Sequence, residues 1–392
     1  MNDFNEMIPL KYGCNPHQAH AAVEVPDGAN SPLELLNGTP SLINVLDALN
    51  GWQLVKEARN AIGLPAAASF KHVSPAGAAV ALPLNDELAR AYEVLGIDLT
   101  PTATAYVRAR GTDPKSSFGD FVALSETVDV PTARFLKGVI SDGIIAPGFD
   151  PEALEILKSK KQGTFIVMKA DDCFVPPKTE RRETFGLALV QDRNDHIISA
   201  ADLQDVVCGS LNPEAVRDLV LGLVVVKYTQ SNSVCYVRAG QTIGIGAGQQ
   251  SRVDCTKLAG AKADLWWLGM HPKVLGLHFR PHVKRQERIN WRVRYIEGDL
   301  TRYETKALED ALEVHVEQLQ LEERKSWLKK LEDVALISDG FIPFRDNIDH
   351  ASQHGVRFIA EPGGSSRSGD VKMACEEYGI TLVHSHLRLF HH

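Results

Sequence analysis

The stretch SLINVLDALNGWQLVKEARNAIGLPAAASFKHVSPAGAAV, residues 41–80, contains both of the patterns that decide the fold class. Residues 41–63 have the pattern of a helix, and residues 66–80 contain short apolar runs of the kind that form buried strands. The rest of the chain keeps this alternation. Strand-like runs occupy residues 121–126, 163–170, 233–240 and 355–360, and a second helix-like stretch covers residues 310–334. The sequence therefore predicts an α/β fold.

Length and composition predict two domains. The chain has 392 residues, of which 44% are hydrophobic and 23% are charged, which is enough apolar material for two packed cores. The best linker signal is FVPPKTERR, residues 174–182, in which two prolines precede a charged run. We therefore expect one domain over residues 1–176 and a second over residues 177–392. No internal repeat is visible in the sequence, which argues against a solenoid.

Charge and hydropathy exclude several classes of partner. The net charge of −8 argues against a general polyanion binder, so no nucleic acid is expected as a partner. The longest apolar run, residues 219–226, is far shorter than the roughly 20 residues that a membrane span needs. The amino-terminal residues lack the basic segment and apolar core of a signal peptide. We therefore expect no membrane partner and a cytoplasmic location.

A titratable pair lies at the end of one apolar run, in SFKHVSPAGAAV (residues 69–80). Lys71 and His72 are adjacent there and are followed at once by a turn sequence. A neighbouring ammonium tends to keep an imidazole neutral, which is the state that a general base needs. Two solvated polar residues at the end of a strand would give the same sequence, so these residues alone fit either interpretation.

Amides, hydroxyls and glycines are gathered in KYTQSNSVCYVRAGQTIGIGAGQQSR, residues 227–252. The amide of Asn232 could donate a hydrogen bond to a developing oxyanion, and Gly244, Gly246 and Gly248 would let backbone N–H groups approach an anion. The glycines do not form a dinucleotide fingerprint, because Gln249 stands where G-x-G-x-x-G requires glycine. A plain tight loop is the alternative interpretation of this segment.

Aromatic and acidic side chains follow another apolar run, in SDGFIPFRDN (residues 338–347), and EPGGSSRSGD (residues 361–370) comes soon after. Phe341, Phe344 and Asp346 would suit a flat heterocycle, which stacks on an aromatic ring and donates its N–H groups to a carboxylate. Buried aromatic residues beside a capping aspartate would look the same in the sequence.

The basic stretch from Arg280 to Arg294 could be mistaken for a nucleic-acid site. In an acidic chain, a solvated helix face or a contact between subunits is the simpler interpretation. His278 and His282 lie four residues apart, but Pro281 and the lack of a nearby acidic partner argue against a zinc helix. No metal site is therefore predicted.

Eight motifs occur in order across nearly the whole chain, namely LKYGCNPHQ, SFKHVSPAGAAV, SSFGDFVALS, SDGIIAPG, KYTQSNSVCY, GIGAGQQSR, GFIPFRDN and LRLFHH. Together they resemble the formyltransferase part of the bifunctional purine enzymes AICAR transformylase/IMP cyclohydrolase, where AICAR is 5-aminoimidazole-4-carboxamide ribonucleotide. The resemblance begins at about Leu10, where the family's formyltransferase half begins. It implies a monofunctional formyltransferase, and ring closure by a separate IMP cyclohydrolase.

The resemblance also implies a fold and partners. Family members have two cytidine-deaminase-like subdomains, each an α/β unit, and work as homodimers with active sites at the interface. The combined zinc signature of true deaminases, H-x-E with P-C-x-x-C, is absent from the sequence, so the fold is expected without the metal. The implied co-substrate is 10-formyltetrahydrofolate, no catalytic metal is implied, and a structural monovalent cation is left open.

Three catalytic residues follow from the resemblance. His72 matches the family's general base, Lys71 its neighbouring cationic catalyst, and Asn232 the amide that orients and stabilises the reacting centre. In this mechanism the ring amine of AICAR attacks the formyl carbon and His72 accepts the proton. Lys71 and Asn232 stabilise the tetrahedral oxyanion or help the tetrahydrofolate nitrogen to leave.

Binding residues follow in the same way. For the AICAR phosphate the resemblance points to Lys11, Tyr12, Lys161 and Arg388, and for the base and ribose to Gly119, Asp142, Arg252 and Asp346. On the folate side it points to Asn44, Val253, Phe341, Ser365 and Ser366. The family usually has arginine where this chain has Lys11. Because lysine lacks the bidentate fork of arginine, the resemblance implies weaker phosphate binding here.

Two rival functions would use the same pocket. One is a deaminase-like or hydrolytic enzyme that acts on a purine-pathway intermediate without a folate, and the folate dependence of turnover would distinguish it. The other is a regulatory nucleotide-binding protein that has lost catalysis. Retention of both Lys71 and His72 argues against this second class.

Overall fold

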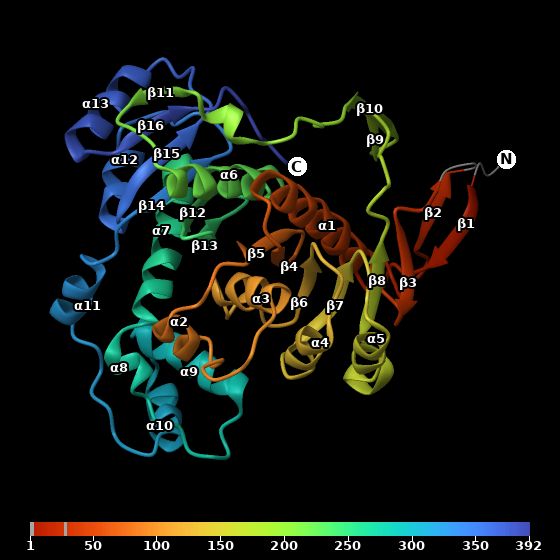
Figure 1. Ribbon diagram of the computed structural model, residues 1–392, viewed down its shortest axis with the longest axis horizontal. Helices are drawn as coiled ribbons and strands as arrows, with labels where there is room; N and C mark the ends of the chain where they lie inside the picture. Colours follow the sequence, from red (N-terminus) through yellow and green to blue (C-terminus); the bar gives the residue numbers. More distant parts are fainter. Residues whose placement is uncertain (1–3, 27–29) are drawn as a thin grey trace.

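The computed structural model describes residues 4–26 and 30–392, and its centre is one large mixed sheet. The first half of the chain supplies β3 (Leu33–Asn37), β4 (Ala66–Lys71), β5 (Ser74–Val80), β6 (Asp120–Leu124), β7 (Ser141–Ala146) and β8 (Ile166–Ala170). The second half supplies β11 (Asp205–Cys208), β12 (Val234–Arg238), β13 (Gln241–Gly246), β14 (Val334–Ser338), β15 (Val356–Glu361) and β16 (Thr381–His384). The strand order is β11-β16-β15-β14-β12-β13-β5-β4-β6-β7-β8-β3 (Figure 1).

The two halves of this sheet have the same topology. β4 and β5 form an antiparallel hairpin, β4 is antiparallel to β6, β6 to β8 run parallel, and β3 closes the edge antiparallel. In the second half, β12 and β13 form the antiparallel hairpin, β12 is antiparallel to β14, β14 to β16 run parallel, and β11 closes the other edge antiparallel. The halves meet where Ala79 of β5 pairs antiparallel with Gln241 of β13. The fold is therefore internally duplicated, although no repeat is visible in the sequence.

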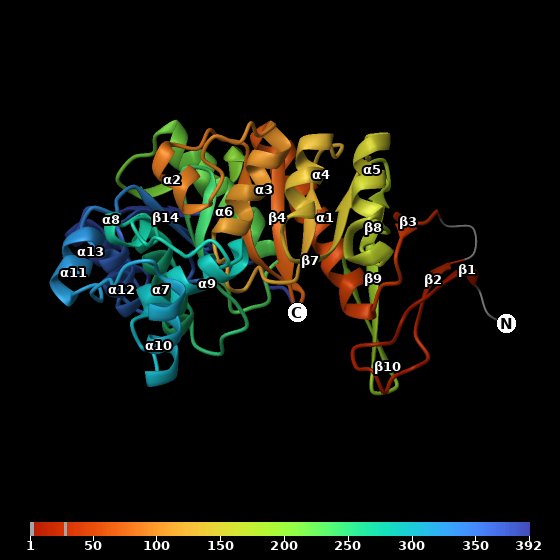
Figure 2. The same cartoon turned by 90° about the horizontal axis from the view of Figure 1, so that it is seen from below.

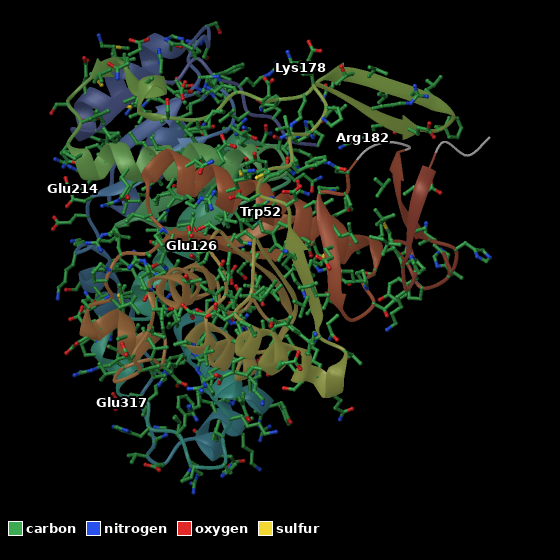
Figure 3. The ribbon with its side chains drawn as sticks, turned by 45° about the vertical axis from the view of Figure 1, so that its right-hand side comes forward. Trp52, Glu126, Lys178, Arg182, Glu214 and Glu317 are labelled. Atoms are coloured by element: carbon green, nitrogen blue, oxygen red, sulfur yellow. The ribbon has the colours of Figure 1, made fainter. Side chains whose placement is uncertain are left out.

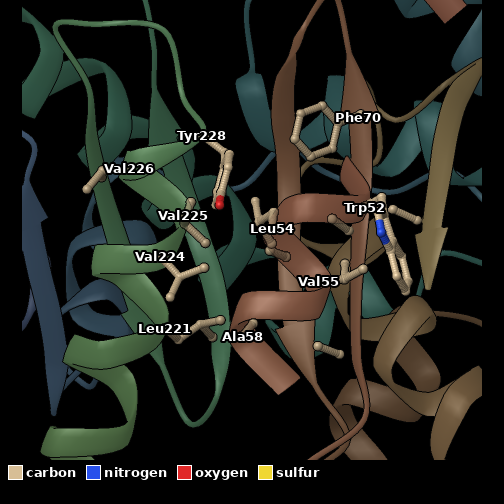
Figure 4. Packing of buried hydrophobic residues seen from close by; sticks show 14 of the residues in the cluster. Trp52, Leu54, Val55, Ala58, Phe70, Leu221, Val224, Val225, Val226 and Tyr228 are labelled. Atoms are coloured by element: carbon tan, nitrogen blue, oxygen red, sulfur yellow. The ribbon is translucent and has the colours of Figure 1, made fainter. Parts of the chain in front are cut away.

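Helices cover both faces of the sheet (Figure 2). One face carries α1 (Leu42–Ile62) and α6 (Pro213–Lys227), one helix from each half, which pack side by side over a shared core (Figure 4). The other face carries α3 (Pro101–Gly111), α4 (Val130–Lys137) and α5 (Pro151–Lys158) in the first half, and α7 (Arg252–Leu268), α12 (Asp346–Ala351) and α13 (Ser368–Tyr378) in the second. The α/β fold predicted from the sequence is confirmed.

The remaining elements lie outside these layers. They are β1 (Phe4–Pro9), β2 (Ala22–Pro26), β9 (Thr179–Thr184), β10 (Leu187–Asp192), α2 (Asp86–Ala91), α8 (Pro272–Leu275), α9 (Arg285–Glu297), α10 (Arg302–Ala311), α11 (Leu321–Leu328) and the 3₁₀ turns η1 (Lys160–Gly163), η2 (Ala200–Leu203) and η3 (Ser352–His354). The β9–β10 hairpin, with Arg182, stands away from the main sheet (Figure 3). Across the described residues, no helix is long and apolar enough to span a bilayer.

The sequence predicts a continuous helix-like stretch over residues 310–334, and the structure shows that this prediction is wrong in length. α10 ends at Ala311, α11 covers only Leu321–Leu328, and the segment between them is not helical. Leu312 instead forms an isolated bridge with Phe279, and the hydroxyl of Tyr295 donates a 2.7 Å hydrogen bond to the carbonyl of Glu317. These contacts give backbone N–H and C=O groups of the segment hydrogen-bond partners outside it, in place of the partners that a helix would supply.

The basic stretch around α9 is neutralised within the chain. Glu93 accepts hydrogen bonds from Arg288 and Arg292, and Arg294 pairs with Glu304 at 3.0 Å. A helix face whose guanidinium groups are already paired offers little free positive charge to a polyanion. Because Arg292 is only 15% exposed and Glu93 only 12% exposed, these arginines pack against the segment that follows α2 and do not form the solvated face expected from the sequence.

Two glycines at equivalent positions of the duplication let a helix approach the sheet closely. A Cβ on Gly77 of β5 would lie 2.1 Å from the carbonyl oxygen of Ala109 in α3, and one on Gly244 of β13 would lie 2.1 Å from that of Ala259 in α7. Gly246 is in similar contact with Cys255 of α7. The interpretation of Gly244 and Gly246 as part of an anion-binding turn is therefore wrong, because both are buried strand residues that pack against α7.

Replacing Gly244 with alanine should destabilise the fold. The added methyl group would overlap the backbone of α7, and overpacking of this kind costs about 1–3 kcal/mol. Thermal unfolding measures the effect. The matched control is Gly369→Ala on α13, where a Cβ meets nothing within 4 Å and the helix should gain up to ~1 kcal/mol. An unchanged melting temperature for Gly244→Ala would contradict this account of the packing.

Candidate active site

The predicted site residues lie along one edge of the main sheet. At this edge β4 and β13 end, and β5, β6, β7, β8 and β12 begin. The reason is that β4 is antiparallel to β5 and β6, β6 to β8 run parallel, and β13 is antiparallel to β5 and β12. β14, β15 and β16 end there as well. Loops at strand ends project freely from a rigid scaffold, which suits them to binding and catalysis.

A first cluster gathers around the end of β4. The ammonium of Lys71 donates a 2.8 Å hydrogen bond to the carbonyl of Gly119, and that of Lys161 donates a 2.6 Å hydrogen bond to Asp142. A Cβ placed on Gly119 would lie 3.2 Å from the Lys71 ammonium and 3.8 Å from the Asp142 carboxylate. Four of the predicted residues, namely Lys71, Gly119, Asp142 and Lys161, are therefore neighbours.

His72 lies in the turn between β4 and β5, where its side chain is exposed. His72 and Val73 both have positive φ angles, of 51° and 63°. Val73 donates its backbone N–H to the carboxylate of Asp47 at 2.6 Å. Burial raises the pKa of Asp47 to about 6, and this hydrogen bond and the charge of Lys71 offset part of the rise.

The amino-terminal segment reaches the same region through α1. Lys11 donates its backbone N–H to the carbonyl of Pro40, and Leu42 donates its own to the carbonyl of Tyr12. Asn44 accepts from the backbone N–H of Ser41 at 2.9 Å and completes the capping box at the start of α1. Lys11, Tyr12 and Asn44 are thus held at the start of the helix whose Asp47 contacts the His72 turn.

A second cluster is built around Arg252, at the start of α7. Its guanidinium donates to the side-chain oxygen of Asn232 at 2.8 Å, to the carbonyl of Ser233 at 3.1 Å, and to Asp339. Asp339 is fully buried and also accepts from the hydroxyl of Ser231 and, at 2.9 Å, from the backbone N–H of Ser233. Because every partner is in place, the Asn232 loop is fixed by a buried ion pair.

The other predicted residues of the second half lie on α7 and on the segments that follow β14, β15 and β16. Val253 follows Arg252 on α7, and Asp346 begins α12, where the side chain of Asn347 donates to it at 2.8 Å. Phe341 is 50% exposed and Phe344 is 58% exposed, so these rings are not the buried aromatics of the alternative interpretation. Ser365 and Ser366 follow β15, and the guanidinium of Arg388 lies 5.0 Å from the ring of Phe390.

The two clusters approach each other at Lys71 and Asn232, but their outer members lie far apart along the sheet. Asp142 is the second residue of β7 and Asp339 follows β14, and six inter-strand spacings of about 4.8 Å place them roughly 29 Å apart along the sheet. That span exceeds the length of a nucleoside monophosphate. Lys71 and Asn232 are nearer, since Ser74 beside the His72 turn accepts a 3.4 Å hydrogen bond from the backbone of Gln230.

Several buried residues that support these clusters were not identified from the sequence. Asp120 accepts hydrogen bonds from Ser69, Tyr106 and Arg110, and it fixes the loop that presents Gly119. Asp339 does the same for Asn232. Asp120 lies within the motif SSFGDFVALS and Asp339 within the segment SDGFIPFRDN, but their burial is visible only in the structure.

Metal-binding and cavity features do not coincide with the clusters. Within residues 4–26 and 30–392, no three His, Cys, Asp or Glu side chains are grouped so that they could hold a metal ion. A cavity of about 240 Å³ lies between α3, α7 and α9, and none of the predicted site residues lines it.

Breaking the buried ion pair of the second cluster should destabilise the protein. Arg252→Met leaves the fully buried Asp339 without its counter-charge, which costs about 3–5 kcal/mol. The control Arg367→Met removes an exposed pair with Asp370 and should cost less than about 1 kcal/mol. Urea denaturation compares the two variants, and equal losses would show that burial does not set the value of the Arg252 pair.

The fold and this edge define an α/β protein with two clusters of lysine, arginine, histidine, asparagine and aspartate side chains at one edge of its sheet. Comparison with known sequences identifies the family. Residues 1–262 match the profile of the AICARFT/IMPCHase bienzyme, and the chain belongs to this family. The chain is 30% identical to the bifunctional purine biosynthesis protein PurH of Magnetococcus marinus, over 99% of its own length and 60% of that protein.

Two further relatives give the same picture. The PurH proteins of Roseobacter denitrificans and Prochlorococcus marinus are 30% and 29% identical to the chain, over 98% and 99% of its length. The chain spans about 60% of the length of these curated relatives, which fits the formyltransferase part of the bienzyme. The family resemblance inferred from the eight motifs is confirmed.

Proposed function

We propose that the chain transfers a formyl group from 10-formyltetrahydrofolate to the 5-amino group of AICAR. The products are formyl-AICAR and tetrahydrofolate, and the reaction belongs to the synthesis of IMP. The observation that carries this proposal is the first cluster, in which Lys71, Gly119, Asp142 and Lys161 are neighbours beside the exposed imidazole of His72. The membership of the chain in the AICARFT/IMPCHase family supports it.

The proposed chemistry is proton transfer with electrostatic stabilisation. The ring amine of AICAR is a weak nucleophile because its lone pair is delocalised, so it must be positioned and deprotonated as it attacks the formyl carbon. His72 accepts this proton. Lys71 and Asn232 supply hydrogen-bond donors for the oxyanion of the tetrahedral intermediate, or for the departing nitrogen of tetrahydrofolate. No metal takes part in this scheme.

The binding roles divide between the clusters. Lys11, Tyr12 and Lys161 from the first half and Arg388 from the second would meet the AICAR phosphate. Gly119, Asp142, Arg252 and Asp346 would hold the base and ribose. For the folate, the exposed ring of Phe341 offers a stacking surface, and Asn44, Val253, Ser365 and Ser366 complete its site.

We further propose that the working enzyme is a homodimer with composite active sites. The separation of roughly 29 Å between Asp142 and Asp339 along the sheet supports this, because the outer members of the two clusters are too far apart in one chain to contact the same nucleotide. A second copy, related by a two-fold axis, would bring the second cluster of one chain to the first cluster of the other. The repeated sheet topology supports two cytidine-deaminase-like subdomains, divided at residues 176/177 in the connection between β8 and β9.

The first test is turnover of the purified chain with AICAR and 10-formyltetrahydrofolate. We expect tetrahydrofolate release, and mass spectrometry should detect formyl-AICAR and report whether any IMP is made. His72→Ala should lower kcat by about 100-fold or more and change the KM for AICAR little, because a general base acts mainly in the transition state. The control His315→Ala removes an imidazole whose side chain is 72% exposed and lies outside both clusters.

The other outcomes point to the rival functions. Turnover of AICAR without a folate would indicate a deaminase-like or hydrolytic enzyme. AICAR binding without any turnover would indicate a regulatory nucleotide-binding protein. An equal loss of kcat and of AICAR affinity in His72→Ala would make His72 a binding residue.

The composite site is tested by mixing two inactive variants. One carries Lys71→Ala and His72→Ala, and the other carries Asn232→Ala. After subunit exchange, half of the dimers are mixed, and each of these has one intact site, so activity should return to about a quarter of the wild-type value. Mixtures that stay inactive although mass spectrometry shows mixed dimers would mean that each chain contains a complete site.

A further inference from the structure

The duplication contains two equivalent hairpin turns with unusual backbone angles. His72 and Val73 join β4 to β5 with φ angles of 51° and 63°, and Ala239 and Gly240 join β12 to β13 with φ angles of 49° and 70°. Two-residue hairpin loops with positive φ at both positions match the twist of the flanking strands, and they favour asparagine and glycine.

Each turn is held by an aspartate from the helix that precedes the hairpin. Asp47 is the sixth residue of α1, and it accepts the backbone N–H of Val73 at 2.6 Å. Asp218 is the sixth residue of α6, and it accepts the backbone N–H of Gly240 at 2.7 Å. Asp47 is only 5% exposed and Asp218 only 4% exposed. The same contact therefore occurs in both halves, at opposite edges of the sheet.

The two turns have different residue types at their second position, where the φ angle is positive in both. Gly240 adopts its positive φ without steric cost, whereas Val73 is β-branched and its positive φ is strained. A strained conformation persists only where the surroundings enforce it, and such residues cluster at functional sites. The strained turn is the one that carries His72, and its Asp47 also faces Lys71.

We propose that Asp47 is a positioning residue, whose carboxylate holds the His72–Val73 turn in its left-handed conformation and so aims the imidazole of His72. Aiming His72 for proton transfer rests on the proposed function, but holding the turn does not. Asp47 acts through the backbone of Val73, and the contact that the structure gives it is with that N–H. Burying the Asp47 carboxylate against the sheet lowers the stability of the folded protein. Lys71 of β4 offsets part of this cost, whereas Asp120 of β6 and Asp142 of β7 add to it.

The kinetic experiment compares Asp47→Asn with Asp218→Asn. Asp47→Asn replaces a charged acceptor with a weaker neutral one, so kcat should fall about tenfold while the KM for AICAR changes less than about twofold. Asp218→Asn weakens the same contact at the turn without a catalytic residue, and kcat should stay near the wild-type value. Equal losses of kcat in the two variants would overturn the proposal.

A rescue variant separates positioning from a purely electrostatic role. Val73→Gly gives the first turn the glycine that the second turn already has at Gly240, so the left-handed conformation no longer needs enforcement. In the Asp47→Asn background, Val73→Gly should restore about half or more of the wild-type kcat. If kcat remains at the Asp47→Asn level, the loss comes from the missing charge beside Lys71, and the positioning role is wrong.

Stability distinguishes positioning from ordinary structural support. The pKa of Asp47 is raised from 3.8 to about 6 by burial, so the folded protein retains a proton between these values that the unfolded chain releases. Asp47 therefore makes the free energy of unfolding of the wild type fall as pH rises from about 4 to 6. Above pH 6 the buried carboxylate is charged, and this loss of stability is complete. Asp47→Asn removes it, so at pH 8 its melting temperature should equal or exceed the wild-type value. A large drop would instead mark a structural residue.

Hydrogen exchange tests the contact without any activity assay. Asp47→Asn should speed exchange of the segment that contains Val73 and leave the segment of Gly240 unchanged, and Asp218→Asn should do the reverse. If this exchange pattern is seen in a protein that shows no formyl transfer, the proposed function is wrong, but the role of Asp47 in holding the turn stands. Unchanged exchange at Val73 in Asp47→Asn would remove that role.

Discussion

The junction of β5 with β13 is the constraint on which the rest of the structure depends. It joins two sheets of the same topology into one, yet the strands pair directly only at Ala79 and Gln241. The hydroxyl of Thr242 adds hydrogen bonds to both backbone groups of Ala78. The shared core of α1 and α6 adds further cohesion, because each large apolar side chain that it buries is worth about 1.5–3 kcal/mol. Lys227 of α6 pairs with Glu57 of α1 inside this core.

This junction explains the layout of the site. Antiparallel pairing at the centre brings the beginning of β6 and β7 and the end of β14 and β15 to one edge of the sheet. The two clusters share that edge but lie in different halves, each organised by one buried aspartate. Asp120 supports the loop of Gly119, and Asp339 supports the loop of Asn232. The duplicated fold thus separates the outer members of the two clusters, and the proposed dimer would bring them to one site.

Much of the fold could be predicted from local patterns. The helix of residues 41–63 and the strands within residues 121–126, 163–170, 233–240 and 355–360 are confirmed, because their apolar spacing reports burial directly. The predictions of a helix over residues 310–334 and of an anion-binding turn at Gly244 and Gly246 are wrong for the same reason. Leu312 and Gly244 are placed by partners distant in the sequence, which are Phe279 and α7. The duplication was also missed, since topology can repeat where residue identities do not.

The sequence by itself determined the residue types and the order of the motifs, and these were enough for the α/β class and the family. It also placed Lys71 beside His72, because adjacency in a chain needs no fold. Only the tertiary structure decided that Gly119, Asp142 and Lys161 join Lys71, that Arg252 joins Asn232, and that Asp142 and Asp339 lie far apart along one edge. The physical reason is that strand order and pairing direction set which loops share an edge. Those choices depend on contacts between residues far apart in the chain, which no local pattern contains.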